Sequence, residues 1–513
     1  MLNEQNSAPV NTAPEQQNDL KRGIQGWQVS FIGLGGVIGS CYFLGLGLCI
    51  KEMGPAILIA FGIVGVIVYG VMICYAELLV NLPRKGSFVA YTNEFLGPSL
   101  SIGMGWSYWF NWVCYVPSEA VAVATVLQYL THSTSAVFYI ASAVGALLAI
   151  TIINISAVDI FARIESGLAI TKVIVILVFI LLAFGIWVGL WGSDHFLGGA
   201  VNFGGSEGFI PQLFPKGGLI IITSMTLVLV TCEGTEIVGL TASESQNPEV
   251  AIPKACRSVS FRLIGLYMIP ILLVVLVYPW DRGSDTTPIF ADIMDQYHMG
   301  FFGTIMSAVV LIAAFSCANT GFYGTVRAMY GLAVEGLAPE FLTKLNKKGN
   351  PRNAVWFTVI FMWVVLILGL ISQLTGALET LYGSLLSLSG FTGTLAWIGI
   401  CGSQIVFRKR LKQRGYEPDE MLQARVSRGQ SWIPPVAMVI QIVCLVMLAF
   451  GDLLVFSIAA ASVFIPMIVL AIGEKTGHQR DINTLHPGEL SFDETYPDLT
   501  RKATGTDDLP PVS

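Results

Sequence analysis

Four ionisable side chains stand inside apolar stretches of the sequence that are long enough to cross a lipid bilayer. They are Glu119, Lys172, Glu233 and Glu236. A charge at the bilayer centre costs about 2.5–3.5 kcal/mol on insertion scales, so such groups normally face a partner, water or a transported molecule. These side chains therefore indicate a polar site at membrane depth.

The chemistry that these groups could support differs from one to the next. Lys172 stands alone in the run LAITKVIVILVF, and a buried lysine changes its protonation state readily, which makes it a candidate proton carrier. The alternative is a lysine whose ammonium reaches the membrane interface. For Glu119 and Glu236, a hydrogen bond to unwound backbone is an alternative to a direct role in binding.

A glycine-rich segment, Gly33 to Gly47, lies within the first apolar stretch and reads GLGGVIGSCYFLGLG. Glycine is a poor helix residue, so this composition predicts a crossing helix that is interrupted near its middle. Non-helical backbone at membrane depth survives only where it is buried in protein or lines a cavity. The free amides of Gly39, Ser40 and Cys41, at the positive end of a half-helix, could then bind a carboxylate. Tight helix packing through Gly35 and Gly39 is the alternative.

A second interruption is predicted in the sixth apolar stretch, where Val230 to Gly239 reads VTCEGTEIVG. Glu233 and Glu236 lie one helical turn apart there, with Gly234 between them. The first and sixth stretches are five apart, which is the offset expected of an inverted repeat whose halves each begin with a discontinuous helix.

The elements that must position these residues are membrane-spanning helices. Of the 513 residues, 54% are hydrophobic and 12% are charged, far from the charged fraction of about 25% in soluble proteins. Apolar stretches of suitable length predict twelve spans, at 27–50, 55–80, 100–130, 135–155, 165–191, 217–243, 259–279, 301–334, 354–373, 379–406, 433–450 and 452–473.

The distribution of basic residues predicts the orientation of these spans. With a cytoplasmic N-terminus, the outer loops contain only Lys51, Lys216 and Arg282, and the other loop arginines and lysines fall on the inner side. Cytoplasmic loops of membrane proteins carry such an excess. Both termini are thus expected in the cytoplasm, and the polar tail from Glu474 onward is expected to be mobile.

Other classes of function find little support in the sequence. The net charge is −6 and there is no basic tract suited to nucleic acid. The nine cysteines form no CxxC and are interpreted as small hydrophobic residues. With neither clustered His and Cys ligands nor a nucleophile elbow, we expect no metal, cofactor or catalytic residue, and an enzyme is the least favoured reading.

Six blocks of sequence then resemble one family, in order along the chain. They are IGLGGVIGSCYFLGLG (32–47), AELLVNLPRKGSFVAY (76–91), GWSYWFNW (105–112), EGTEIVGLTASESQNPEVAIPKA (233–255), ANTGFYGTVRAMYGLAVEGLAP (318–339) and SGFTGTLAWIGI (389–400). The chain resembles bacterial amino acid permeases of the amino acid-polyamine-organocation superfamily over residues 24–410. The similar branch holds the lysine, arginine, aromatic amino acid and gamma-aminobutyrate permeases.

The resemblance implies an all-α integral membrane fold of the leucine-transporter architecture. Ten core helices would form two inverted repeats of five, at 24–192 and 193–410, with helices one and six discontinuous. The polar tail 1–23 would be disordered and cytoplasmic. Residues 411–475 would hold the end of a cytoplasmic loop and two peripheral helices, and 476–513 a second cytoplasmic tail.

The resemblance also implies roles for individual residues. The amides of Gly39, Ser40 and Cys41 would hold the carboxylate of an amino acid, and the carbonyls of Val37, Val230 and Glu233 its ammonium. Cys232 and Glu236 would belong to the same site. Lys172 matches the fifth-helix lysine that replaces a sodium ion in proton-coupled relatives, and Glu119 is assigned to proton coupling with it.

Three positions depart from the family pattern, which usually has glycine at 41 and aromatic residues near 230 and 232. Here they are Cys41, Val230 and Cys232, so the specificity of better-known members does not carry over. Glu233 stands where relatives tend to be uncharged. A carboxylate facing the pocket would favour a cationic side chain such as that of lysine, arginine or ornithine.

The leading hypothesis is a proton-coupled importer of an amino acid that works by alternating access in the cytoplasmic membrane. Its partners would be the amino acid, a proton and the lipid bilayer, and no nucleic acid. An exchanger that swaps an amino acid for an amine or another amino acid fits the same residues. A membrane sensor that binds an amino acid without transporting it is a third possibility, which the short tails disfavour.

Overall fold

The computed structural model of the chain describes most of its length. The described residues are 36–84, 86–156, 158–190, 201–206, 208–240, 248–346, 349–376, 381–475 and 489–500. The first residues of the glycine-rich segment, 33–35, and the predicted N-terminal tail lie outside these ranges. Within them, every regular element is helical.

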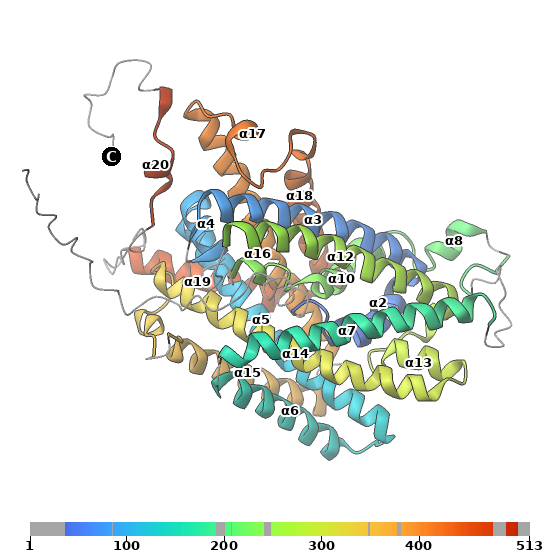
Figure 1. Cartoon of the computed structure of the whole chain (residues 1–513). Helices are drawn as coiled ribbons and strands as arrows, with labels where there is room; N and C mark the ends of the chain where they lie inside the picture. Colours follow the sequence, from blue (N-terminus) through green and yellow to red (C-terminus); the bar gives the residue numbers. More distant parts are fainter. Residues whose placement is uncertain are drawn as a thin grey trace, which may run out of the picture.

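Long helices make up the body of the molecule (Figure 1). They are α3 (Ile57–Asn81), α5 (Pro98–Thr131), α6 (Ala136–Ser156), α7 (Val158–Trp187), α12 (Pro248–Val277), α14 (Gly300–Val334), α15 (Arg352–Leu374), α16 (Leu381–Gln413), α18 (Ile433–Gly451) and α19 (Leu453–Lys475).

Shorter elements connect or cap these helices. They are η1 (Cys41–Gly45), α2 (Leu46–Met53), η2 (Gly54–Ala56), α4 (Ser87–Leu96), α8 (Phe209–Leu213), α9 (Ile220–Thr223), α10 (Met225–Leu229), η3 (Val230–Cys232), α11 (Ile237–Leu240), η5 (Trp280–Arg282), α13 (Ile289–Gln296), η6 (Glu340–Thr343), α17 (Pro418–Met421), η7 (Arg428–Gln430) and α20 (Phe492–Thr495).

In the described residues, nine helical segments are long and apolar enough to cross a membrane. The twelve-span count remains a prediction, and four of the twelve predicted spans, the first, second, sixth and seventh, account for the difference. The first and second join into one segment, Cys41–Asn81, because only the bend at Gly54 and Pro55 separates α2 from α3. The sixth is divided into pieces too short to cross. The seventh lies within α12, of which Gly265–Val277 is the apolar part whose side chains are described.

The helices form an inner group and an outer group. α5 packs against both α14 and α16, and 72% of the most apolar part of α5 is buried, against 11% for α19. The outer helices α6, α15, α18 and α19 turn large apolar side chains outward, such as Ile152, Ile360, Val446 and Ile468. An apolar outer surface of this extent is what a lipid environment requires, because few soluble proteins expose comparable patches.

The two ends of the helix bundle differ in charge. We call the end that carries Arg84, Arg408 and Arg414 the basic end, where α4 and α20 lie toward the left of Figure 1. The opposite end carries α8 and α13, at the right of the view, with Asp292 on α13.

Part of the polar tail departs from the mobile segment that the sequence predicts. Residues 489–500 are packed on the basic end, where Phe492 is 1% exposed and Tyr496 is 7% exposed. Aromatic side chains bury large apolar areas even when their neighbours in the sequence are polar. The tail is polar on average, so its composition does not indicate that Phe492 and Tyr496 are buried.

Candidate functional site

The predicted first interruption falls at residues 36–39, which form turns and bends before the helix begins at Ser40, and the residues before 36 lie outside the described part of the chain. The Gly39 amide donates to the Val37 carbonyl over 3.0 Å, and a π-helix, η1, follows. A methyl group at Gly39 would come within 2.4 Å of the Glu119 carboxylate. Glycine is required there because that carboxylate, on α5, lies directly against the backbone.

Glu119 caps the half-helix that begins after this interruption. The Ser40 amide donates to both carboxylate oxygens of Glu119, each over 3.1 Å. The sequence predicts free amides at Gly39, Ser40 and Cys41 that could bind a carboxylate, and in this structure the first two donate within the protein. Gly39 and Ser40 have internal acceptors because an N–H group buried without a partner would be costly.

Three side chains that the sequence reasoning did not single out complete this region. The Tyr115 hydroxyl donates to the Cys41 thiol over 2.9 Å, and the Cys317 thiol donates to the Gly36 carbonyl over 2.9 Å. The hydroxyls of Ser40 and Tyr382 are 2.9 Å apart. Tyr115 precedes Glu119 by four residues, which places both on one helix face. This spacing could have identified Tyr115 from the sequence.

Lys172 joins the first interruption from α7. Its side chain is fully buried and interacts electrostatically with Glu119 and Cys317. The nearest carboxylate in its own apolar run, Glu165, is two turns away in the sequence. Folding therefore gives Lys172 a partner from another helix, and the two predicted proton-coupling residues are brought together.

The second interruption separates α10 from α11. After η3, Glu233 is extended, with φ −65° and ψ 151°, and Gly234 has φ 101°. The Gly234 amide donates to the two Glu236 carboxylate oxygens over 3.1 and 3.0 Å. Tyr108 and Trp397 donate to the same carboxylate over 2.8 and 2.9 Å. Glu236 thus stabilises the turn in which it lies. Its carboxylate accepts hydrogen bonds from the Gly234 amide, the Tyr108 hydroxyl and the Trp397 ring.

The two interruptions lie against each other. A methyl group at Gly234 would stand 2.6 Å from the Gly36 carbonyl oxygen, so the two backbones are in contact. The Tyr267 hydroxyl, on α12, reaches the carbonyls of Thr231 and Val37 over 2.8 and 3.3 Å. The Val230 carbonyl accepts from the Glu233 amide over 3.3 Å. Breaks far apart in the sequence therefore form one unit at the centre of the bundle.

Comparison of the sequence with known proteins assigns the chain to a family. The sequence profile described as "Amino acid permease" matches residues 28–477. The chain belongs to the amino acid permease family. Both interruptions, Glu119 and Lys172 lie within the matched part.

Individual relatives agree with this assignment. The chain is 34% identical to the amino-acid permease RocC of Bacillus subtilis (strain 168) over 405 residues, which cover 78% of this chain and 83% of that protein. It is 31% identical to the lysine-specific permease LysP of Lactococcus lactis subsp. cremoris (strain MG1363), with 78% of each covered. This permease is therefore a multi-pass membrane protein that transports amino acids.

A solved structure supports the fold alone. The manganese transporter of Eremococcus coleocola, in complex with an aromatic bis-isothiourea substituted compound, matches with a TM-score of 0.52 and 13% identity. The match covers 88% of this chain and 96% of that one. The permease has an all-helical transporter fold. In the described part of the chain, no group of three or more His, Cys, Asp or Glu side chains could hold a metal ion.

The Glu233 side chain lies against α5 and α16. Thr394 donates to one of its oxygens over 3.5 Å, and the other oxygen, Oε2, lies beside the Asn111 side chain. A methyl group at Gly393 would come within 2.2 Å of that oxygen and 2.6 Å of the Asn111 amide nitrogen. Since Glu233 is only 4% exposed, the permease holds a carboxylate in a confined polar space that Gly393 keeps open.

The other predicted members of the site are buried around the two breaks. Val37, Cys41, Val230 and Cys232 are each at most 5% exposed. The aromatic residues of 105–112 have mostly structural contacts, such as the hydrogen bond from the Trp109 ring to Thr358. Tyr108 is the exception because it holds Glu236.

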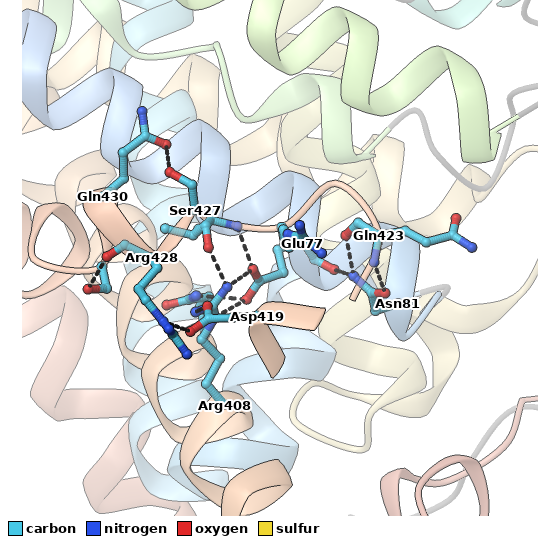
Figure 2. Close-up of polar contacts among 12 residues, drawn as sticks. Glu77, Asn81, Arg408, Asp419, Gln423, Ser427, Arg428 and Gln430 are labelled. Carbon is cyan, nitrogen blue, oxygen red and sulfur yellow. Dashed lines mark hydrogen bonds and ion pairs between the residues drawn. The ribbon is translucent and has the colours of Figure 1, made fainter. Parts of the chain in front are cut away.

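A second polar cluster lies at the basic end of the permease, and Figure 2 shows it. Glu77 of α3 is fully buried and forms an ion pair of 2.7 Å with Arg408 of α16, which also pairs with Asp419 over 2.9 Å. The Val426 amide donates to Glu77 over 2.7 Å. Asn81 and Gln423 exchange two hydrogen bonds beside them.

This cluster fixes α3 to α16 and to the segment that follows it. Burial opposes ionisation of Asp419, but hydrogen bonds from Arg408 and Arg428 outweigh it and hold the pKa of Asp419 below its usual value. Asp419 thus stays ionised and keeps the two arginines in place. Arg327 lies over the Tyr323 ring, and Glu335 accepts from Asn93.

Proposed function

We propose that this permease imports an amino acid through the cell membrane, with the basic end in the cytoplasm, by alternating access around the two interruptions. Inward proton movement drives the import, since each charge that crosses the membrane field is worth roughly 2.3 kcal/mol per 100 mV. The observation that carries the proposal is the pairing of the Glu119 carboxylate with the Ser40 amide.

That pairing links the substrate to a proton. Glu119 occupies a backbone amide that suits the carboxylate of an amino acid, because the positive end of a half-helix favours an anion. Two carboxylates at one amide repel each other, so the substrate binds as Glu119 is neutralised by a proton or moves toward Lys172. Substrate binding and protonation of Glu119 are then thermodynamically coupled.

The rest of the substrate is assigned as follows. Its carboxylate takes the amides of Gly39, Ser40 and Cys41, and its ammonium takes the carbonyls of Val37, Val230 and Glu233. These carbonyls lie at the contact between the two breaks, where Tyr267 already donates to one of them. Cys41 and Cys232 border the same space, and Glu236 supports the turn.

We assign a preference for cationic side chains to Glu233. Its carboxylate is buried and contacts the neutral side chains of Asn111 and Thr394, and a buried carboxylate is costly unless a cation pairs with it. Asn111 and Ser389 stand beside it, with the Ser389 hydroxyl donating to Asn111. Lysine, arginine or ornithine would place a positive charge at this carboxylate.

Proton coupling is tested by uptake of labelled amino acids into proteoliposomes with and without an inward proton gradient. We expect the gradient to raise accumulation in the wild-type protein and to have no effect in Lys172→Ala. Lys51→Ala is the matched control, because Lys51 is exposed. Gradient-independent uptake together with a fully active Lys172→Ala protein would refute the coupling. Uptake that occurs only into vesicles preloaded with substrate would identify an exchanger.

The side-chain preference is tested by competition between labelled lysine and unlabelled amino acids. Glu233→Gln keeps the shape of the side chain and removes its charge, so lysine affinity should fall by about tenfold, the factor that 1.4 kcal/mol gives. Affinity for leucine or alanine should change little. Equal effects on cationic and neutral substrates would show that Glu233 serves the structure of the break and not the selection of a cation.

A further inference from the structure

Residues 489–500 form a strap across the basic end of the permease. The strap includes α20 and lies beyond residues 28–477, the part of the chain that the family profile matches. The family match therefore does not describe it.

Two aromatic side chains anchor the strap. The Phe492 ring packs against Phe95 of α4 and Phe407 of α16, with centroid distances of 5.7 and 5.8 Å. The Arg414 guanidinium lies 4.6 Å from the centre of the Phe492 ring, and Tyr496 packs against Phe407 at 5.8 Å. The anchors join α4 to the end of α16.

Polar contacts tie the strap to three elements. The Phe492 amide donates to Glu94 of α4 over 2.9 Å, and the Tyr496 hydroxyl donates to the Asn81 carbonyl at the end of α3 over 2.8 Å. Arg414, just after α16, donates to the Tyr496 carbonyl over 2.6 Å and pairs with Asp493. The ends of α3, α4 and α16 are thus held by one short segment.

The strap has local structure of its own. Ser491 and Glu494 form a capping box at the start of α20, and hydrogen bonds from the Ser491 amide and hydroxyl hold the pKa of Glu494 below its usual value. A segment shaped by its own hydrogen bonds loses less entropy on docking. Asp493 is 76% exposed, so one face of the strap stays in solvent.

The helix that the strap holds also touches the second interruption. α4 packs against α11, the half-helix that follows Glu236. Tyr75 of α3 packs against Tyr91 of α4 and lies directly against Gly239 of α11. On its other side, Asn93 of α4 donates to Glu335 at the end of α14 over 3.0 Å. A displacement of α11 would therefore displace α4, which the strap opposes.

We propose that the strap is an autoinhibitory latch, which stabilises the closed basic end by holding α4 against α16 and slows the movement of α11. The latch rests on the proposed function, because it regulates the alternating access assigned above. Release of the strap, by competition for Phe492 and Tyr496 or by loss of the Arg414 contacts, frees α4 and accelerates transport.

The test compares two truncated proteins in proteoliposomes. One ends after Gly488 and lacks the strap, and the matched control ends after Thr500 and keeps it. We expect initial uptake by the strapless protein to be faster by about fivefold, the lower end of common allosteric couplings, and the control to match the full chain. Uptake by the strapless protein at or below the rate of the control would overturn the latch.

Hydrogen exchange gives a second readout that needs no transport. Backbone amides of α4 and α11 should exchange faster without the strap, while those of α15, which the strap does not contact, should not change. Unchanged exchange in α4 and α11 overturns the latch even if no variant transports amino acids, an outcome that would separately refute the proposed function. Faster exchange with unchanged uptake would make the strap a structural brace only, which also overturns the proposal.

A point variant covers the case in which the truncated chain does not fold. Phe492→Ala removes the central anchor and leaves the capping box, so it should reproduce the faster uptake and exchange. Leu499→Ala is the control within the strap, because Leu499 is 40% exposed. Equal behaviour of the two variants would contradict the latch.

Discussion

The two interrupted segments of this permease solve one problem in different ways. Each exposes a backbone amide in the middle of the bundle, and each satisfies it with a carboxylate. At the second break the carboxylate is local, since Glu236 accepts from the amide two residues before it and from two aromatic donors. At the first break it comes from α5, and Glu119 is 79 residues from Ser40 in the sequence.

The difference indicates a division of labour. Glu236 belongs to the turn that it stabilises, and its removal would leave Tyr108, Trp397 and Gly234 without an acceptor. Glu119 comes from another helix, accepts from Ser40 and Tyr115 and interacts with Lys172, so its departure would not remove a residue of the turn itself. We therefore expect the second break to keep its conformation during transport, and the first break to exchange the Glu119 carboxylate for that of the substrate.

The largest expected effect is at the contact between the breaks. Gly234→Ala would set a methyl group 2.6 Å from the Gly36 oxygen at a residue with φ 101°. We expect a stability loss of at least about 2 kcal/mol and loss of transport, measured by thermal unfolding in detergent and by uptake. The control is Gly62→Ala, where nothing lies within 4 Å. Equal unfolding temperatures would show that the breaks can separate freely.

Glu236→Gln should have the next largest effect on stability. Either orientation of the amide places an NH₂ group against Gly234 and against Tyr108 or Trp397, all of which donate. Unsatisfied buried donors cost about 1–3 kcal/mol, so the unfolding temperature should fall clearly. Glu52→Gln, at a half-exposed ion pair, is the control. A Glu236→Gln protein as stable as the wild type would contradict the stabilising role of Glu236 at the second break.

Tyr267→Phe should weaken the link between the breaks without removing either. The variant loses the hydrogen bonds to Thr231 and Val37 and keeps the ring, so we expect a loss of about 1 kcal/mol. Thermal unfolding of this variant combined with Glu236→Gln should show non-additive losses, because the two sites share the second break. Simple additivity would argue that the breaks are stabilised independently.

Glu119→Gln should affect stability least and the proton dependence of transport most. Its single amide oxygen can still accept from Ser40, so the loss should stay below about 1 kcal/mol. Uptake should lose its response to a proton gradient, since Gln does not titrate. The proposed difference between the two breaks would be refuted if Glu119→Gln is as unstable as Glu236→Gln, or if uptake by Glu119→Gln keeps the wild-type dependence on pH.

The sequence located both breaks, because Gly33 to Gly47 and Val230 to Gly239 depart from an otherwise regular apolar pattern. It also selected the buried charges, since a lysine or glutamate is conspicuous among Leu, Ile and Val. Composition along one stretch suffices for such features. The membrane class followed from the same patterns, and the expectation of a transporter fold came from the resemblance to amino acid permeases. The comparisons agree with both.

What the sequence did not show depends on distant parts of the chain. Tyr267, Tyr382 and Cys317 reach the breaks from three helices, and no local pattern marks them. Glu119 was selected as a buried charge, but its pairing with Ser40 requires α5 to lie against the first break. The strap was missed because Phe492 and Tyr496 stand in a polar segment, where average composition predicts no packing.

The burial of all nine cysteines has a practical consequence for the experiments. Alkylating reagents act on accessible thiolates, and a thiol enclosed in protein reacts slowly. A single cysteine placed on an exposed position, such as Asp493 in the strap, would be the principal site of labelling in the otherwise unaltered chain. Fluorescent or spin labels could then follow the movement of the strap without first replacing Cys41, Cys232 and Cys317 around the breaks.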